Sequence, residues 1–138
     1  MQNGGPDDGK ICSIHQQWGC MKGSVLNMMA NRLLITRSRE EFQYFRPYML
    51  RMLGWIRRER EKSSTDGVSL CKGLFPVGKG CDWDDVAQFW CTTDAINAGG
   101  ILRMAEAFAA FDDPETQALR DEGEAYLQIL KDIFAEQY

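Results

Sequence analysis

The feature that most constrains the fold is a helical pattern that occurs twice along the chain. In two segments, apolar residues recur every three or four positions, the spacing of one buried face of an α-helix. When Met29-Ala30 is aligned with Met104-Ala105, the turn at 36–38 falls on the turn at 111–113, an offset of 75 residues. A helix and turn that occur twice predict two copies of one helical hairpin.

Each predicted hairpin contains a second helix with its own start signal. Residues 38–41 (Ser-Arg-Glu-Glu) form a capping box, in which Ser38 accepts the N3 amide hydrogen bond and Glu41 reaches back. In the second hairpin, Asp113-Pro114 supplies a cap and a first helical residue. Pro47 predicts a kink near residues 43–46. The pattern therefore indicates an all-α fold of four main helices in two antiparallel hairpins.

We expect these helices to form a single domain. A chain of 138 residues has the size of one domain and can bury a core without disulfides or a metal. Residues 1–17 are predicted to be an N-terminal arm, and residues 18–138 the helical domain. Within it, we expect a hairpin at 18–62, a long loop at 63–83 and a hairpin at 84–138.

Two details inside the helices carry expectations of their own. We expect the third helix to follow a cap at Asp82 and to run through Phe89 and Trp90. Residues 97–100 (Asn-Ala-Gly-Gly) mark either a weak point in that helix or a place where another backbone comes close. The last helix is expected to bury an apolar stripe: Leu119, Tyr126, Leu127, Leu130, Ile133 and Phe134.

Charge differs between the two hairpins. Residues 32–62 hold nine basic and four acidic side chains, whereas residues 82–138 hold three basic and thirteen acidic ones, so we expect the hairpins to attract each other. The run at 57–62 is expected to be a solvated helix end, where basic charge suits the dipole. The net charge of −4 disfavours nucleic acid as a partner.

Other composition signals bear on redox state, metals and membranes. The five cysteines form no C-x-x-C pair, which favours reduced thiols, and His15 is the sole histidine, which disfavours a zinc site. No nucleotide or cofactor motif is present, so we expect no cofactor. The absence of a long apolar stretch or a signal-peptide pattern leads us to expect a soluble cytoplasmic chain with no membrane partner.

The clearest chemical signal lies in the Gly-rich loop at 73–85. There, Asp82, Asp84 and Asp85 flank Trp83. Carboxylates accept hydrogen bonds from vicinal sugar hydroxyls, and an indole stacks on the apolar face of a sugar ring. A carboxylic acid with a raised pKa also protonates a glycosidic oxygen. The residues equally fit a structural role, with the aspartates at a helix N-terminus and Trp83 in the core.

Two further groups are candidates for contact with a sugar. Gln17 and Trp18 precede the first helix, at the end that the repeat matches to the Asp82 loop, so both loops should open on one face. Trp90 and Asp94 lie one helical turn apart and are placed to face the same opening. Here too a structural interpretation stays open, because Trp18 and Trp90 fit core positions and Asp94 fits a solvated one.

Five short segments together resemble a known family, the six-hairpin glycosidases, glycoside hydrolases with an (α/α)6 toroid that include α-L-rhamnosidase-like enzymes. The resemblance covers residues from about 12 to 138. It is carried by the segments 15–19, 35–42, 55–60, 73–76 and 82–83. It implies a partial toroid-like array with a carbohydrate pocket at one end, where Asp82 is a candidate catalytic acid. Gln17, Trp18, Trp83, Asp84, Trp90 and Asp94 are candidate substrate contacts.

The size of the chain departs from that family. A closed toroid needs six hairpins, whereas this chain has two, so the chain is either part of a longer enzyme or associates with copies of itself. In the second case, three copies would supply the twelve helices of a closed toroid, so a homotrimer is the hypothesis for such an association. The competing interpretation is a non-catalytic helical-repeat module that binds a protein through an apolar face.

Overall fold

The protein is all-α. The computed structural model describes residues 4–5, 8–10, 19–65, 72–78 and 89–137. Its four helices are α1 (Met21–Thr36), α2 (Arg39–Thr65), α3 (Cys91–Ala109) and α4 (Thr116–Gln137). The candidate residues Gln17, Trp18, Asp82, Trp83 and Asp84 lie outside the described residues.

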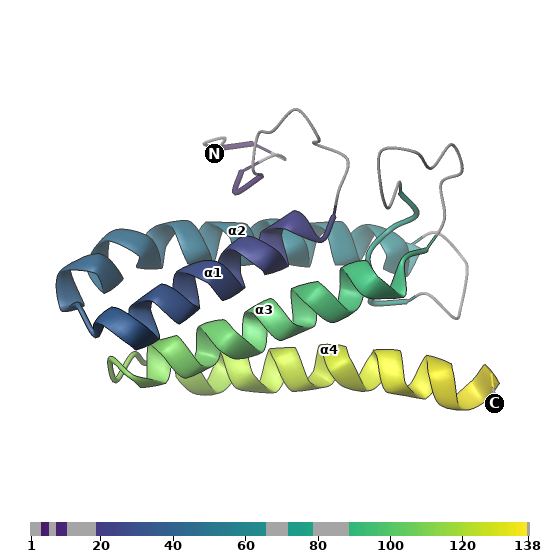
Figure 1. Ribbon diagram of the computed structural model, residues 1–138. Helices are drawn as coiled ribbons and strands as arrows, with labels where there is room; N and C mark the ends of the chain where they lie inside the picture. Colours follow the sequence, from purple (N-terminus) through teal and green to yellow (C-terminus); the bar gives the residue numbers. More distant parts are fainter. Residues whose placement is uncertain (1–3, 6–7, 11–18, 66–71, 79–88, 138) are drawn as a thin grey trace.

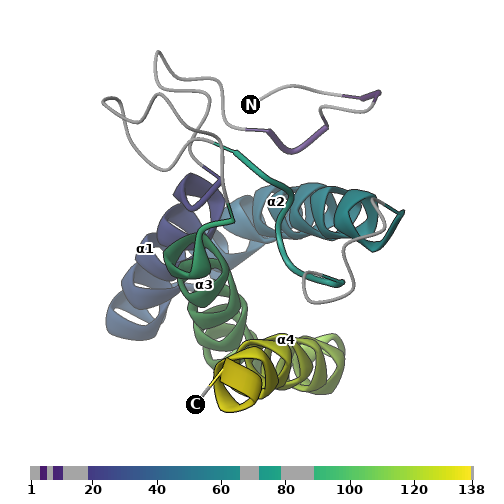
Figure 2. The ribbon, with the colours of Figure 1, turned by 90° about the vertical axis from the view of Figure 1, so that its right-hand side faces the viewer.

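The helices form two hairpins with equivalent partners side by side. Helices α1 and α3 begin at the same end of the molecule and run in the same direction, while α2 and α4 return (Figure 1). The main packing contacts are those of α1 with α3 and of α3 with α4, with α2 alongside α1 (Figure 2). The observed arrangement thus confirms the helical class and the four expected helices.

The start of α2 follows from local sequence, with one difference from the predicted capping box. The Glu41 amide donates to Ser38 Oγ at 3.2 Å, as predicted. The Glu41 carboxylate, however, accepts hydrogen bonds from Arg32 and from Thr36 Oγ1, the latter at 3.0 Å. It joins the end of α1 to the start of α2. Helix α2 then continues through Pro47 to Thr65, three residues beyond the expected end.

The predicted beginnings of α1 and α3 are wrong by several residues. Helix α1 begins at Met21, not at Trp18. Helix α3 begins at Cys91, because Trp90 has an extended backbone with φ −113° and ψ 98° and occupies the N-cap position. Phe89 is likewise not helical. The apolar spacing of Phe89 and Trp90 fits a helix, but these two residues lie before the first turn of α3.

The glycines of α1 and α3 bring these helices into direct backbone contact. A Cβ on Gly100 would lie 2.7 Å from Gly23 Cα, and a Cβ on Gly23 would lie 2.5 Å from Asn97 Cα. Either distance is too short for a real side chain. The second interpretation of residues 97–100 is therefore confirmed, because α3 continues without a break while another backbone comes close.

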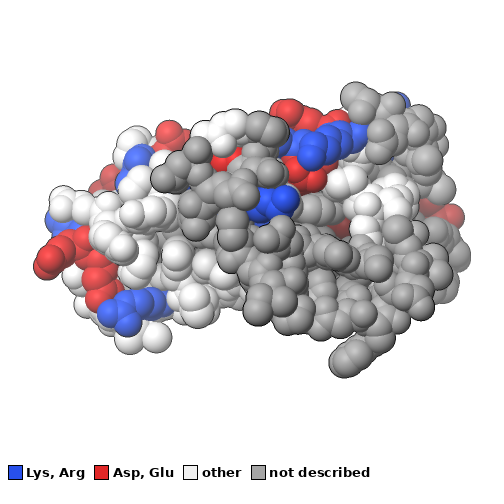
Figure 3. Space-filling view, turned by 90° about the horizontal axis from the view of Figure 1, so that it is seen from above, with Lys and Arg blue, Asp and Glu red and all other residues white. Residues whose placement is uncertain are grey.

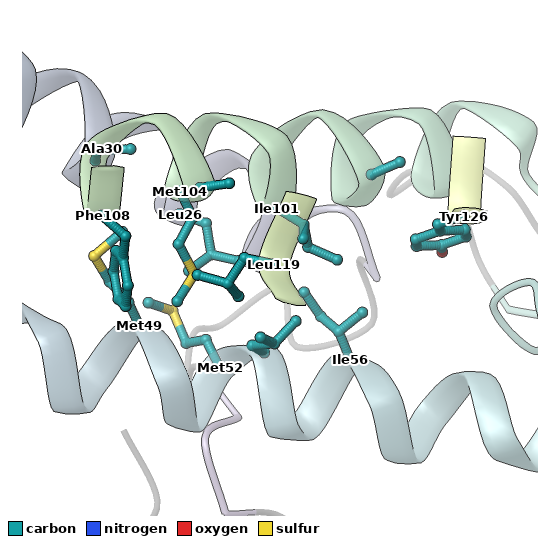
Figure 4. Packing of buried hydrophobic residues seen from close by; sticks show 14 of the residues in the cluster. Leu26, Ala30, Met49, Met52, Ile56, Ile101, Met104, Phe108, Leu119 and Tyr126 are labelled. Carbon is teal, nitrogen blue, oxygen red and sulfur yellow. The ribbon is translucent and has the colours of Figure 1, made fainter. Parts of the chain in front are cut away.

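The core lies between α2 and the other three helices, and α1 contributes Leu26, Ala30 and Leu33 to it. Met49, Met52 and Ile56 of α2 point toward α3 (Figure 4). At one end, Phe42 stacks on Phe111 with ring centroids 4.4 Å apart. The fully buried apolar side chains in this cluster include Leu26, Leu33, Met49, Met52, Leu53, Ile56, Ile101, Met104, Phe108, Leu119 and Tyr126. Phe134, predicted to be buried, is 47 % exposed, and α4 extends past its neighbours at that end.

Ion pairs join the two hairpins, as their opposite charges predict. Arg46 of α2 pairs with Asp113 at 2.6 Å, and Arg57 pairs with Glu122 of α4 at 2.5 Å. On the face seen from above, basic and acidic side chains of the described residues lie close together at the left end and along the upper edge (Figure 3). Within the described part of the chain, none of the helices has the length and apolar character that crossing a bilayer requires.

Candidate functional site

The site of interest is the end of the molecule where α1 and α3 begin. Gly19, directly after Trp18 in the sequence, leads into α1, and Trp90 leads into α3. The described segment 72–78 comes immediately before the residues that carry Asp82 and Trp83. The attachment points of both predicted sugar-binding loops can therefore be located, although the loops themselves lie outside the described residues.

Asp94, in the first turn of α3, holds segment 72–78 from the inside. Only 1 % of its surface is exposed. Its Oδ1 atom accepts the Phe75 amide at 2.7 Å and the Tyr126 hydroxyl at 2.5 Å. The side chain thereby links three parts of the chain, and this geometry makes it a positioning residue. Direct contact between Asp94 and a ligand remains a prediction.

The second oxygen of this carboxylate is unsatisfied. Asp94 Oδ2 is buried and has no hydrogen-bond partner among the described residues. Burial raises the pKa of Asp94 above its ordinary value, against the opposing effects of the Tyr126 and Phe75 hydrogen bonds and the charge of Arg60. Burial likewise raises the pKa of Tyr126, with the neighbouring Asp94 charge acting in the same direction. Tyr126 therefore stays protonated and donates to Asp94.

The C-terminal end of α2 holds the same segment from the other side. Arg60 Nε donates to the Gly73 carbonyl at 2.5 Å, and Ser63 Oγ donates to the Leu74 carbonyl at 2.5 Å. The Arg60 guanidinium lies 3.5 Å from the centre of the Tyr126 ring. Burial lowers the pKa of Arg60. Residues 57–62 were expected to be a solvated helix end, and for Arg60 that expectation is wrong because it packs against this ring and segment.

Trp90 holds the far end of the segment. Its indole Nε1 donates to the Gly78 carbonyl at 2.9 Å, and the side chain is half-buried. The polar edge of the indole is therefore already engaged within the protein. The part of Trp90 that could still contact a sugar is the exposed part of its ring face, which is the surface used in stacking. Its predicted role in substrate contact is not tested by this geometry.

Asn97 connects the start of α1 to the same group. Its Oδ1 atom accepts the Gly23 amide at 2.9 Å, and its Nδ2 donates to the Gly19 carbonyl at 3.3 Å. A Cβ on Gly19 would lie 2.8 Å from the Phe75 ring and 2.9 Å from Thr93. The residue after Trp18 thus packs directly against segment 72–78 and α3.

Sequence reasoning missed the roles of Asn97, Arg60 and Ser63. For Asn97 a signal existed, since an asparagine beside two glycines indicates close backbone approach with a polar side chain to satisfy it. For Arg60 and Ser63 no such signal exists, because they lie in a run of polar residues typical of a solvated surface. In the described parts of the chain, no group of three or more potential ligands is placed to hold a metal ion.

Comparison of the chain with protein-family models, with curated proteins and with solved structures gave no match. The site must therefore be interpreted from its own residues, and the resemblance to six-hairpin glycosidases remains a prediction.

Proposed function

We propose that this chain is a glycoside-hydrolase-like unit, two hairpins of an (α/α)-toroid-like array, that binds carbohydrate at the end where α1 and α3 begin. The observation that supports this most is the fixation of segment 73–78 by hydrogen bonds. Gly73, Leu74, Phe75 and Gly78 each bond to a side chain from α2 or the start of α3.

Fixation of this segment matters because the candidate sugar-binding residues come shortly after it in the sequence. These are Asp82, Trp83 and Asp84, which combine carboxylates with an aromatic face. A loop that is held at its base loses less conformational entropy when it binds a ligand, so more of the contact energy appears as affinity. The anchoring of Gly19 brings the attachment point of Gln17 and Trp18 to the same end.

In this proposal the residues divide the work by their chemistry. Trp83 and Trp18 stack on the apolar face of a sugar ring, as does the free face of Trp90. Gln17 and Asp84 hydrogen-bond to hydroxyl groups. Asp82 is the candidate general acid that protonates the glycosidic oxygen, and hydrolysis also needs a second carboxylate on the other side of the bond.

The test is a calorimetric titration of the chain with a panel of defined plant and bacterial oligosaccharides. We expect Trp83→Ala to weaken the binding of any bound glycan by at least about tenfold, since one stacked ring contributes on the order of 1 kcal/mol or more. Asp82→Asn should abolish turnover while leaving binding within about tenfold. Asp121→Asn, an exposed aspartate on α4, is the matched control and should change neither quantity.

A second candidate function, a non-catalytic helical-repeat module that binds a protein, is favoured by a different observation. The outer face of α1 exposes Met28 and Ile35 beside an open apolar groove. Under this alternative, Trp83→Ala and Asp82→Asn leave the binding of the partner protein unchanged. If no glycan in the panel binds the unaltered chain, the carbohydrate proposal is contradicted.

A further inference from the structure

The outer face of α1, opposite the core, carries large apolar side chains in the open. Met28 is 63 % exposed and Ile35 is 81 % exposed. Together with Ala95, Ile96 and Gly99 of α3, they line an open groove of about 1100 Å³. Exposed apolar side chains grouped in one groove are typical of an interaction surface.

The two walls of this groove differ in shape. The α1 wall carries the long side chains of Met28 and Ile35, whereas the α3 wall carries Ile96 beside an open space at Ala95 and Gly99. A Cβ built on Gly99 meets no atom within 4 Å, so the chain itself leaves that space open. A twofold axis places the α1 wall of one chain on the α3 wall of the other, and the reverse, so one such groove is complementary to a copy of itself.

The register of the two helices shows which residues would meet. Gly23 contacts Gly100, and Arg103 Nε donates to Asn31 Oδ1 at 2.7 Å. A residue of α1 therefore lies level with the residue about 75 positions later on α3. A twofold axis parallel to the helices keeps these levels, so the Met28 backbone lies level with residue 103 of the other chain. Because helical side chains lean toward the N-terminus, the Met28 side chain covers the turn at 99–103.

The charges on the two walls are complementary at the same level. Arg32 lies on the α1 side, exposed and paired with Glu41. Glu106 is not one of the groove-lining residues, but it follows Gly99 by seven positions and so lies on the same face of α3, exposed and paired with Arg103. With an offset of about 75 residues, Arg32 of one chain lies next to Glu106 of the other. The twofold symmetry produces this contact between opposite charges twice.

We propose that this groove is the interface of a symmetric homodimer, in which Met28 of one copy occupies the open space above Gly99 of the other and Ile35 lies over the last turn of α3. The groove-lining residues of α1 extend from Ser24 to Thr36, over most of the length of that helix. The groove also reaches Ser24 and Ala95, near the starts of α1 and α3, whereas Ile35 lies at the opposite end of α1 from the residues where the two loops attach.

Sedimentation equilibrium of the full chain over a hundredfold concentration range tests the interface. The expected mass is twice that of the 15.7 kDa chain, in reversible exchange with monomer. A monomer at every concentration would overturn the proposal. A trimer, the closure expected from counting hairpins, would overturn it as well, because a threefold assembly cannot pair the groove with itself.

Two variants locate the interface without disturbing the fold. Ile35→Glu places a charge in the groove at an exposed position and should raise the dimer dissociation constant by at least about thirtyfold. Phe134→Glu, a comparable change at an exposed apolar residue of α4, is the control and should leave it unchanged. A dimer that responds to neither variant, or only to Phe134→Glu, would show that another face is used.

A size exchange tests the proposed contact between Met28 and Gly99. Gly99→Leu fills open space in the single chain, so the fold should be retained, but the new side chain occupies the place of Met28 from the other copy. The dimer should therefore weaken by at least about tenfold and recover when Met28→Ala is added. If the double variant associates no better than Gly99→Leu alone, the proposed contact is wrong.

Discussion

At the scale of single residues, the candidate site depends on polar side chains that the fold has enclosed. Asp94, Asn97 and Ser63 are all buried, and each hydrogen-bonds to backbone of a segment remote in sequence. Buried polar groups with such partners stabilise one arrangement of the chain over its alternatives, since breaking the bond leaves an unsatisfied group. These residues therefore specify the position of segment 73–78.

Asp94 should give the protein a recognisable dependence of stability on pH. Burial raises the pKa of Asp94 in the folded state, so the folded protein binds this proton more tightly than the unfolded chain. The contribution of this proton binding to stability is fully present below the pKa of Asp94 in the unfolded chain, near 3.8. It is lost as pH rises through the pKa of Asp94 in the folded protein.

The variant Asp94→Asn isolates this effect, because asparagine does not titrate. The difference in free energy of unfolding, protein minus variant, should rise as pH is lowered from neutral toward 4, and it should be constant above the folded pKa. Urea denaturation across this pH range measures it. A difference that shrinks on acidification would mean that Arg60 and the hydrogen bonds from Phe75 and Tyr126 outweigh burial.

Adjacent serines at the end of α2 provide a matched comparison. Ser63 is buried and bonds to the Leu74 carbonyl, whereas Ser64 is exposed and reaches only the Arg60 carbonyl at 3.4 Å. Ser63→Ala should lower the free energy of unfolding by about 1–2 kcal/mol, because it leaves a buried carbonyl without its donor. Ser64→Ala should change it by less than about 0.5 kcal/mol. Equal effects in chemical denaturation would contradict the role assigned to Ser63.

At the scale of helices, the contact between α1 and α3 depends on the absence of a side chain at two positions. A Cβ on Gly100 would lie against the Gly23 backbone, which cannot move aside as a flexible side chain does. The neighbouring Gly99 faces open space. Position 100 therefore has no room for a side chain, whereas position 99 does.

This contrast leads to a prediction for two equivalent substitutions. Gly100→Ala should destabilise the protein by about 1–3 kcal/mol through overpacking of the two helices. Gly99→Ala should stabilise it by about 0.5–1 kcal/mol, since alanine is the better helix former. Thermal denaturation at low protein concentration checks both. If the two variants shift the melting temperature in the same direction, the close contact at Gly100 is not real.

The same scale shows which parts of the structure the sequence could predict. Periodicity identified the four helices, and the cap at Ser38 located the start of α2, because these depend on residues close in sequence. The start of α3 was placed too early because the indole of Trp90 bonds to Gly78, 12 residues away. The burial of Asp94 depends on Tyr126, 32 residues away, and a single sequence carries no signal of such a pairing.

At the scale of the whole molecule, the proposed carbohydrate site and the proposed dimer interface involve different residues of the two hairpins. One end gathers the attachment points of the loops that carry Asp82, Trp83 and Trp18, and the outer face of α1 presents the apolar groove. Ile35 lies in the last turn of α1, at the opposite end of the helix from Gly19 and Trp90, where these loops attach. Ile35→Glu should therefore leave glycan affinity unchanged while it dissociates the dimer.

The tryptophans allow the central claim, carbohydrate binding at this end, to be tested directly. Of the four, Trp18, Trp83 and Trp90 belong to the proposed site, whereas Trp55 is buried against Lys22 in the core. A titration with oligosaccharides, followed through the indole N–H signals in nitrogen-15 NMR spectra, should shift the signals of the first three and leave that of Trp55 in place. If no glycan shifts the three site signals, or if Trp55 alone responds, the proposed site is wrong.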